Sequence, residues 1–590
     1  MVKCFTKKEA ALYKTEEMST NDKISLVNEL NKKATDTKRQ SKLQAVRYNH
    51  VLEKIKSHPK GFDQGLKAYL ATDRSELSRA LSLEGKMRGI QARYSSQVYT
   101  MMEEFMPTKL GFDLHRKAQS DFMDVLINNE NIDPKYQKMA NEWLKTKEDL
   151  RIRFNKAGGN IKKLKDWHMP TDHDAYLILK GGANRTRGMT DADKYQKWYN
   201  LMLETVDLEK MGMKTDEFAK SAKSAYKNIT SDGVLEFEMK THGTGKLANK
   251  HQQSRFFKFK DADAYKKYHA EYSSATPYNI MMDYINDMTS EIALMEGLGP
   301  NPDLTIKSLA KDSGFITSEN IYANLSGKTS AKNLTVAQSA DTIRNITTGI
   351  KLAGATITAV ADIPLHMITN HYNGLPAMSS IIKTIGGLNQ TAEDRALAAK
   401  LWVPLDHMID SAHSAARYSE VTGHKGSKRF ASGILKMSLL DAWTYVQKDS
   451  FHKVFLQTMA DNINQPHMQR TFRRYGITAE EVKIINASKK MEDRGVEFVD
   501  PNALPEDLAE RITGMIISET KYAVTEGESY IRAGMNQGTR KGEAGGETLR
   551  FAGQFKTFPA SVIGNHWMRM FNGSEGDIGS KAAYFANFVV

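Results

Sequence analysis

The stretch Asp341–Ile368, DTIRNITTGIKLAGATITAVADIPLHMI, decides the fold expected for this chain. Its apolar and small positions recur at steps of three and four residues, which is the spacing of a helix and not of a strand. These positions are Ile343, Ile346, Ile350, Ala353, Ile357 and Val360. Pro364 is expected to kink or end the helix, because proline has no amide proton to donate to an interior turn. The sequence therefore predicts a slim central helix.

Two interpretations of this helix stay open. In the first it is a buried central helix of an α-domain, because the uncharged run from Leu352 to Ala361 is nearer in length to a core helix than to a membrane span. In the second the segment enters a bilayer after a conformational change, and Asp362 is then an intramembrane charge with a specific role. Small residues let neighbouring helices approach closely inside a membrane.

The composition narrows the class of protein. The 590 residues carry a net charge of +13, which favours contact with polyanions such as DNA or an anionic membrane. The single cysteine, Cys4, excludes an intramolecular disulfide and a cysteine-based zinc site. The N-terminus shows no signal-peptide pattern, so we expect synthesis in a cytoplasm. Residues 1–60 hold 14 Lys and Arg against 7 Asp and Glu; this basic arm is either a solvated helical face or a surface for DNA or a neighbouring subunit.

Helical periodicity continues on both sides of the central stretch. Asp73 and Glu76 have the spacing of a capping box that opens a new helix. Gly158-Gly159 is expected to end the helix before it. Helices are predicted at Lys135–Asn155, Asp191–Met211, Tyr278–Leu298, Thr391–Thr422, Ser427–Asn464 and Pro501–Ser518, loops at 311–334 and Thr539–Thr548, and one hairpin near Gly233–Lys240 and Phe256–Phe259.

These patterns predict a mainly α protein, an elongated multi-helix bundle with at most a small β-hairpin. We divide it into an N-terminal helical region with the basic arm (1–165), a middle helical region (166–310), a polar linker (311–340) and a C-terminal helical region (341–590). The run Ala582–Val590, AAYFANFVV, is apolar to its last residue, so we expect the natural chain to continue or a second membrane-active helix to begin there.

Candidate catalytic and binding motifs are partial. The loop Asp166–Asp174 holds two His and three Asp, which suits either a metal site or a proline-fixed loop with Asp caps, and the spacing favours the latter. Gly245-Lys246 and Gly327-Lys328 lack the first glycine of a phosphate-binding loop. Glu528-Ser529 is similar to one piece of the lytic transglycosylase pattern, without the rest of its context. We expect no catalytic residue, no metal and no cofactor.

Five blocks together resemble the large internal virion proteins of tailed bacteriophages. They are RFNKAGGNIKKLKDWHMPTDHD (153–174), GTGKLANKHQQSRFFKFKDADAYKKY (243–268), PYNIMMDYINDMTSEIALMEGLGPNP (277–302), AVADIP (359–364) and LRFAGQFKTFP (549–559). The matching motif positions are Arg153, Phe154, Asn155, Ala157, Gly158, Gly159, Trp167, Pro170, His173, Asp174, Asp362, Pro364, Gln554, Phe555, Lys556, Phe558 and Pro559. Thr171-Asp172 stands where the family pattern has Gln-Ser.

The resemblance implies a non-enzymatic ejection protein of the inner core. Such a protein is packaged in the capsid near the portal, forms a symmetric oligomer of its own copies, and leaves with the DNA to help form a conduit across the host envelope. Its expected locations are the host cytoplasm during assembly, the virion interior, and the host envelope after ejection. Expected partners are further copies of itself, the portal and other internal virion proteins, phage DNA through non-specific charge, and the host membrane after ejection. The alternatives are a virion-associated peptidoglycan-cleaving enzyme and a DNA-binding packaging accessory protein.

Overall fold

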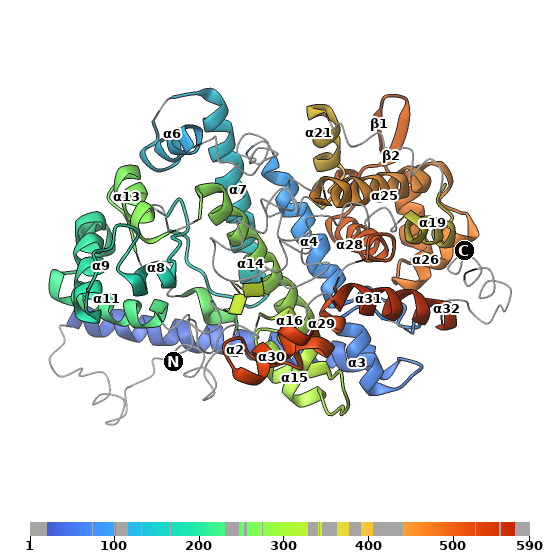
Figure 1. The fold of residues 1–590 in the computed structure, drawn as a ribbon, viewed down its shortest axis with the longest axis horizontal. Helices are drawn as coiled ribbons and strands as arrows, with labels where there is room; N and C mark the ends of the chain where they lie inside the picture. The colour runs from blue at the N-terminus through green and yellow to red at the C-terminus, as the bar shows by residue number, and fades with distance from the viewer. Residues whose placement is uncertain are drawn as a thin grey trace.

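A computed structural model shows a mainly α-helical chain, which confirms the predicted fold class (Figure 1). Among the residues that the structure describes, the strands are β1 (Lys490–Asp493) and β2 (Val496–Val499), an antiparallel hairpin in which Lys490 lies opposite Val499. The structure describes residues 20–73, 75–99, 101, 116–130, 132–164, 167–230, 247–252, 257–273, 275–327, 340–341, 343–344, 363–376, 391–404, 440–525, 527–553, 556–572 and 584.

Several helices of the first part of the chain begin at capping side chains. Ser82, Thr190 and Thr276 each accept a hydrogen bond from a backbone N–H of the first turn. The helices are α2 (Thr20–Lys56), α3 (Phe62–Leu70), α4 (Leu83–Gln97), α6 (Arg116–Asn128), α7 (Pro134–Lys156), α8 (Ala175–Lys180), α9 (Asp191–Thr205), α10 (Leu208–Met211), α11 (Thr215–Thr230), the 3-10 helix η3 (Leu247–Gln252), α13 (Ala262–Tyr272), α14 (Pro277–Leu298), α15 (Pro302–Leu309) and α16 (Ser318–Leu325).

Helices of the second part include two with complete capping boxes, at Thr391 and Thr478. They are α19 (Ile363–Asn373), α21 (Ala392–Lys400), α25 (Leu440–Asn462), α26 (Pro466–Arg474), α27 (Ala479–Ala487), the 3-10 helix η6 (Pro501–Ala503), α28 (Glu506–Ala523), α29 (Ser529–Asn536), α30 (Ala544–Gly553), α31 (Thr557–Val562), the π-helical turn η7 (Ile563–Trp567) and α32 (Met568–Asn572).

The larger hydrophobic core surrounds α14. This helix has Pro277 in its first turn, ends at Gly299, and is buried on all sides over most of its length. Met281, Met288 and Met295 pack there with side chains of α4, α6 and α7, so these methionines fill core space as flexible apolar side chains commonly do. The helices predicted at Lys135–Asn155 and Tyr278–Leu298 are therefore confirmed as α7 and α14.

A second core lies between α25 and α28. Its buried side chains include Phe451 and Phe455 of α25 and Ile512 and Ile516 of α28, and the hairpin contributes Val499. A third, aromatic cluster joins α8, α9, α11 and α13 around Trp198. These clusters occupy different parts of the molecule in Figure 1, with α14 and α4 between the aromatic cluster and the second core.

Three glycines let α4 and α28 cross closely, and this crossing joins the larger core to the second core. A Cβ atom on Gly89 would lie 2.1 Å from the carbonyl oxygen of Glu510, and one on Gly514 would lie 2.4 Å from the carbonyl oxygen of Gly85. Because real Cβ atoms do not approach backbone oxygen so closely, only glycine fits at this crossing.

Most of the central stretch Asp341–Ile368, Asp362 included, lies outside the described residues, so the continuous helix there stays a prediction. Helix α19 begins at Ile363, and Pro364 is exposed in its first turn, where proline is tolerated. In the part of the chain that the structure describes, no helix has both the length and the apolar composition needed to cross a bilayer.

The hairpin that the structure describes lies at another place in the chain than the predicted one. Phe259 forms an isolated bridge with Val206, whereas the hairpin lies at β1 and β2, where Arg494 and Gly495 both adopt positive φ in the turn. An Arg-Gly pair between short alternating segments was the local signal for that turn. The rest of the predicted hairpin segments, except 257–258, lies outside the described residues.

Two predicted loops contain helices. Helix α16 falls within 311–334, begins at the cap Thr317 and buries Ile321 and Leu325 in the larger core. Helix α30 begins at Ala544, inside the predicted loop Thr539–Thr548. Polar composition suggested loops in both places, whereas tertiary packing of one face is enough to hold a short helix.

Candidate functional site

Arg153 of the first family-like block lies at a meeting point of three helices. Its guanidinium on α7 contacts Glu296 of α14 at 2.9 Å (Nε to Oε1) and Glu510 of α28 at 2.8 Å (Nη2 to Oε2). The Glu510 side chain is 2% exposed, so this is a largely dehydrated charge pair whose disruption would strand a carboxylate. Phe154, the next motif position, is fully buried in the larger core.

The motif positions after Phe154 bind the N-terminal helix α2. Arg39 donates to the carbonyl oxygens of Asn155 at 2.9 Å and Gly159 at 2.6 Å, and Gln40 donates to that of Gly158 at 3.0 Å. Gly158 has a φ of +126°, and a Cβ there would meet the Pro300 ring at 2.5 Å. The predicted end of the helix at Gly158-Gly159 is confirmed. The carbonyl oxygens of these glycines also accept hydrogen bonds from α2.

Trp167 and Pro170 contact aromatic side chains of the N-terminal half. The Trp167 ring lies 5.7 Å from the Tyr284 ring of α14, and Lys147 lies 4.7 Å over the Trp167 ring. The hydroxyl of Tyr265 donates to the carbonyl oxygen of Pro170 at 2.8 Å. Both motif residues therefore attach the loop to its surroundings.

His173 and Asp174 also have structural partners. His173 Nδ1 lies 2.6 Å from the hydroxyl of Tyr268, which accepts a hydrogen bond from the Trp198 ring N–H. Asp174 caps α8 by accepting from the backbone N–H of Tyr176 at 3.0 Å. Among the described residues no group of three His, Cys, Asp or Glu is placed to hold a metal ion.

The remaining motif positions lie elsewhere. Lys556 precedes α31 and is exposed, Phe558 and Pro559 lie in α31, and Pro364 lies in α19. Asp362, Gln554 and Phe555 are outside the described residues. Figure 1 shows α19 and α31 on one side of the molecule and α8 on the other, so the structure does not gather the motif positions into one site.

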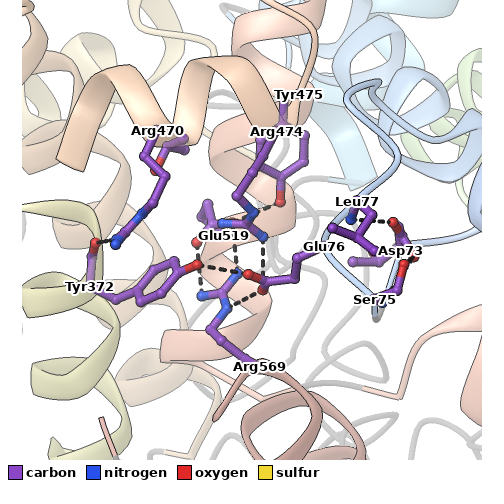
Figure 2. Close-up of polar contacts among 12 residues, drawn as sticks. Asp73, Ser75, Glu76, Leu77, Tyr372, Arg470, Arg474, Tyr475, Glu519 and Arg569 are labelled. Atoms are coloured by element: carbon purple, nitrogen blue, oxygen red, sulfur yellow. Dashed lines mark hydrogen bonds and ion pairs between the residues drawn. The ribbon is translucent and has the colours of Figure 1, made fainter. Parts of the chain in front are cut away.

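A buried ion cluster of Glu76, Arg474, Glu519 and Arg569 is the most concentrated group of charges that sequence reasoning missed (Figure 2). Glu519 of α28 is fully buried, and its Oε1 accepts from Arg569 at 2.9 Å and from the Tyr475 hydroxyl at 2.8 Å. Its Oε2 accepts from Arg569 Nη1 at 3.0 Å, so Arg569 holds the carboxylate through both oxygens.

Glu76 closes the cluster from the N-terminal part of the chain. Its Oε1 accepts from Arg569 Nε at 2.7 Å and from Arg474 Nη2 at 2.9 Å, and its Oε2 accepts from the Tyr372 hydroxyl at 2.7 Å. The cluster thus ties the loop between α3 and α4 to α19, α26, α28 and α32, as Figure 2 shows.

The predicted capping box at Asp73 and Glu76 is wrong. The Asp73 carboxylate accepts from the backbone N–H groups of Leu77 at 2.8 Å and Ser78 at 2.7 Å and so organises a loop. Glu76 has a φ of +59°, and its side chain points away from Asp73 into the ion cluster (Figure 2). Helix α4 begins only at Leu83.

The aromatic rings of Tyr372 and Tyr522 stabilise the positive charges of nearby arginines. Guanidinium groups lie over Tyr372 at 4.0 Å (Arg470) and 4.4 Å (Arg569), and Arg569 lies 3.3 Å over Tyr522. Burial alone would raise the pKa of Glu519, but Arg569 and Arg474 outweigh burial and lower the pKa to about 2. Glu519 therefore stays ionised at neutral pH.

Helix α32 and the turn before it bury polar side chains and expose apolar ones. His566 and Arg569 are buried, with His566 Nε2 donating to the carbonyl oxygen of Tyr522 at 2.9 Å and Nδ1 lying 2.7 Å from the Tyr584 hydroxyl. The opposite side exposes an apolar face, namely Ile563, Trp567, Met568 and Phe571, with exposed fractions of 61%, 47%, 37% and 53%. The polar side is thus inside the fold, and the apolar side is outside.

Glu528, the residue of the transglycosylase-like pattern, is covered. Its side chain is 1% exposed, it accepts from the Thr72 hydroxyl at 3.3 Å, and Lys521 Nζ lies 3.7 Å away. A general acid must reach the glycosidic oxygen that it protonates, and this carboxylate is enclosed by its own chain.

Comparisons with known proteins give no match: no protein-family model, no curated protein and no solved structure matches this chain.

Sequence reasoning missed the ion cluster because its members are separated by up to 493 residues. A single sequence carries no local signal for such pairing. The apolar face could have been predicted from the sequence, because Ile563, Trp567 and Phe571 recur at steps of four beside polar residues. Which side of that helix lies inside follows from the charges that Arg569 meets.

Proposed function

We propose that this chain is an internal virion protein of a tailed bacteriophage. It is packaged in the capsid as a symmetric oligomer of its own copies, next to the portal and other internal virion proteins, and it is released with the DNA to help form a conduit across the host envelope. The five family-like blocks, in their order along the chain, support this proposal. Where the structure describes block 153–174, its positions make anchoring contacts, which suits an assembly protein.

The observation that carries the proposal is the apolar face of η7 and α32. Soluble monomers rarely expose contiguous large apolar side chains, and such patches commonly mark contacts with other molecules. Trp567 and Phe571 lie side by side on this face, with ring centroids 5.6 Å apart. The last family-like block, Leu549–Pro559, leads directly into this segment. We interpret the face as an assembly contact that the buried His566 and Arg569 hold in position.

The peptidoglycan-cleaving alternative finds less support. The candidate general acid of that alternative, Glu528, is enclosed by Thr72 and Lys521. Incubating the purified chain with peptidoglycan, with lysozyme as the positive control, tests this alternative directly. Release of soluble glycan by the chain, lost in Glu528→Gln, would favour the enzyme.

Quantitative mass spectrometry of purified virions tests the proposed function. We expect the chain in intact virions and its depletion after DNA release is triggered in vitro. Presence at equal amounts before and after release would indicate a fixed structural part. Absence from virions would overturn the proposal.

A matched pair of variants tests the apolar face. Virions assembled with Trp567→Gln/Phe571→Gln should contain several-fold fewer copies of the chain, because the proposed contact is removed. Phe315→Gln is the control, since Phe315 is 73% exposed and lies outside the apolar face. Equal copy numbers for both variants, with the purified double variant as thermally stable as the parent, would contradict an assembly role for this face.

A further inference from the structure

Helix α2 turns one side to the protein and the other to solvent. Gln40, Val51 and Ile55 are buried on the inner side, and Gln44 there donates to the carbonyl oxygen of Leu298 at 3.1 Å and to the Thr305 hydroxyl at 2.6 Å. The outer side carries a basic ridge of exposed lysines, namely Lys38, Lys42, Lys54, Lys56 and, just beyond the helix end, Lys60. In Figure 1 the helix runs along one edge of the molecule.

Few acidic side chains accompany the lysines of the basic ridge. Glu53 is the only exposed acidic residue between positions 34 and 60. Among the described residues, no acidic side chain pairs with Lys38, Lys42 or Lys56. Consistent with a positive surface, burial together with Lys54 and Arg47 lowers the pKa of His50.

We propose that the basic ridge binds the phosphate backbone of duplex DNA. The choice of DNA as the polyanion rests on the proposed function. The charge and geometry of the ridge are observations that do not depend on that function. From Lys38 to Lys56 the helix rises about 27 Å at 1.5 Å per residue, which matches about eight base pairs of duplex. Lysine ammonium groups contact phosphate as point charges and carry no base preference, so the binding is independent of sequence.

The chemistry of the ridge favours DNA over a lipid surface. A helix that binds a membrane interface places large apolar side chains such as Trp, Phe or Leu in the bilayer below its lysines. On the outer side of α2, Val46 is the one large hydrophobic exposed between positions 34 and 56. The buried side of α2 packs against the core and is hydrogen-bonded to α14 and α15, so it is not free to insert into a bilayer.

The test uses the full chain and a fluorescent 30-base-pair duplex of random sequence, titrated at several salt concentrations. We expect log Kd to rise with log salt at a slope of about 3 or more, because each lysine that meets a phosphate displaces a counterion. Lys38→Gln/Lys42→Gln/Lys56→Gln should lower that slope by about 2 to 3 and weaken binding about tenfold or more at 0.1 M salt.

The control variant is Lys400→Gln/Lys483→Gln/Lys489→Gln, which removes the same charge from exposed positions in the other half of the chain. It should bind like the parent. Equal weakening in both triple variants would indicate diffuse charge and overturn the proposal. So would absence of DNA binding by the parent, or binding through the ridge to vesicles of 30% phosphatidylglycerol without binding to DNA.

The test is separate from that of the proposed function. DNA binding that depends on the ridge lysines, in a chain that mass spectrometry finds absent from virions, would overturn the phage assignment and leave the ridge as a DNA-binding surface. A chain present in virions that binds DNA equally well with and without the ridge lysines would overturn only the inference about α2.

Discussion

At the scale of single residues, Arg569 is the side chain on which the ion cluster depends. It contacts both carboxylates, Glu76 at 2.7 Å and Glu519 at 2.9 Å, and is itself fully buried. Replacing it with methionine leaves those carboxylates short of a cation in a dry environment. We expect Arg569→Met to lower the free energy of unfolding by about 3–5 kcal/mol, measured by urea denaturation.

Two further variants show whether the loss comes from a stranded charge. Adding Glu519→Gln to Arg569→Met should recover part of the lost stability, because the unpaired carboxylate is removed. Lys483→Met breaks the exposed pair with Glu480 and should change stability by less than about 0.5 kcal/mol. A loss below about 1 kcal/mol for Arg569→Met would show that the cluster does not hold the fold together.

The same residues show why sequence reasoning stopped short of the site. Asp73 and Glu76 have the spacing of a capping box, which is a local pattern. Their actual partners differ: Asp73 binds its own loop, and Glu76 binds Tyr372, Arg474 and Arg569. Partners 296 to 493 residues away outweigh the capping preference, which is worth about 1 kcal/mol. No local spacing pattern in the sequence predicts such partners.

At the scale of elements, the crossing of α4 and α28 depends on glycine. We expect Gly89→Ala to be strongly destabilising, by roughly 2–4 kcal/mol, because the added Cβ meets the backbone oxygen of Glu510 and the helices must separate. Gly545→Ala is the control, since a Cβ there has nothing within 4 Å and alanine favours the helix. It should leave the melting temperature unchanged or raise it; equal loss in both variants would contradict the close crossing.

Elements were predictable where the apolar pattern was long and strong. The segments that became α7 and α14 have buried faces over five or more turns, and Gly299 marks the end of the second. Helices α16 and α30 were missed because they are only 8 and 10 residues long and carry few large apolar side chains. Such short helices exist through packing against neighbours, which composition does not reveal.

At the scale of the whole molecule, buried neutral histidines make stability depend on pH. Burial lowers the pKa of His366 to about 4, and those of His452 and His566 to about 3, from an ordinary 6.5. Between these values and 6.5 the unfolded chain binds more protons than the folded chain. The stabilisation is therefore complete above pH 6.5 and is lost as the pH falls towards 4, by up to about 1.4 kcal/mol per pH unit for each histidine.

Thermal unfolding between pH 7.5 and 4.5 measures this dependence. We expect the melting temperature to fall steadily below pH 6.5, before protonation of Glu519 contributes below pH 4.5. His452→Gln should flatten the curve, because it removes one of the buried neutral histidines. A melting temperature that is constant from pH 7.5 to 5 would contradict the buried neutral state of these histidines.

The contact between Glu76 and Arg569 also has a consequence for biosynthesis. Ribosomes add about 5–20 residues per second, so the 493 residues between these partners take roughly 25–100 seconds to synthesise. For most of that time the nascent N-terminal half holds a carboxylate whose guanidinium partners, Arg474 and Arg569, have not yet been synthesised. The helix α4, which follows this loop, also lacks its crossing partner α28 until residue 523 has been added. The contacts around Glu76 are therefore complete only once Arg569 has been synthesised, and we expect nascent chains stalled before residue 500 to bind chaperones and to be cut readily by protease near Glu76.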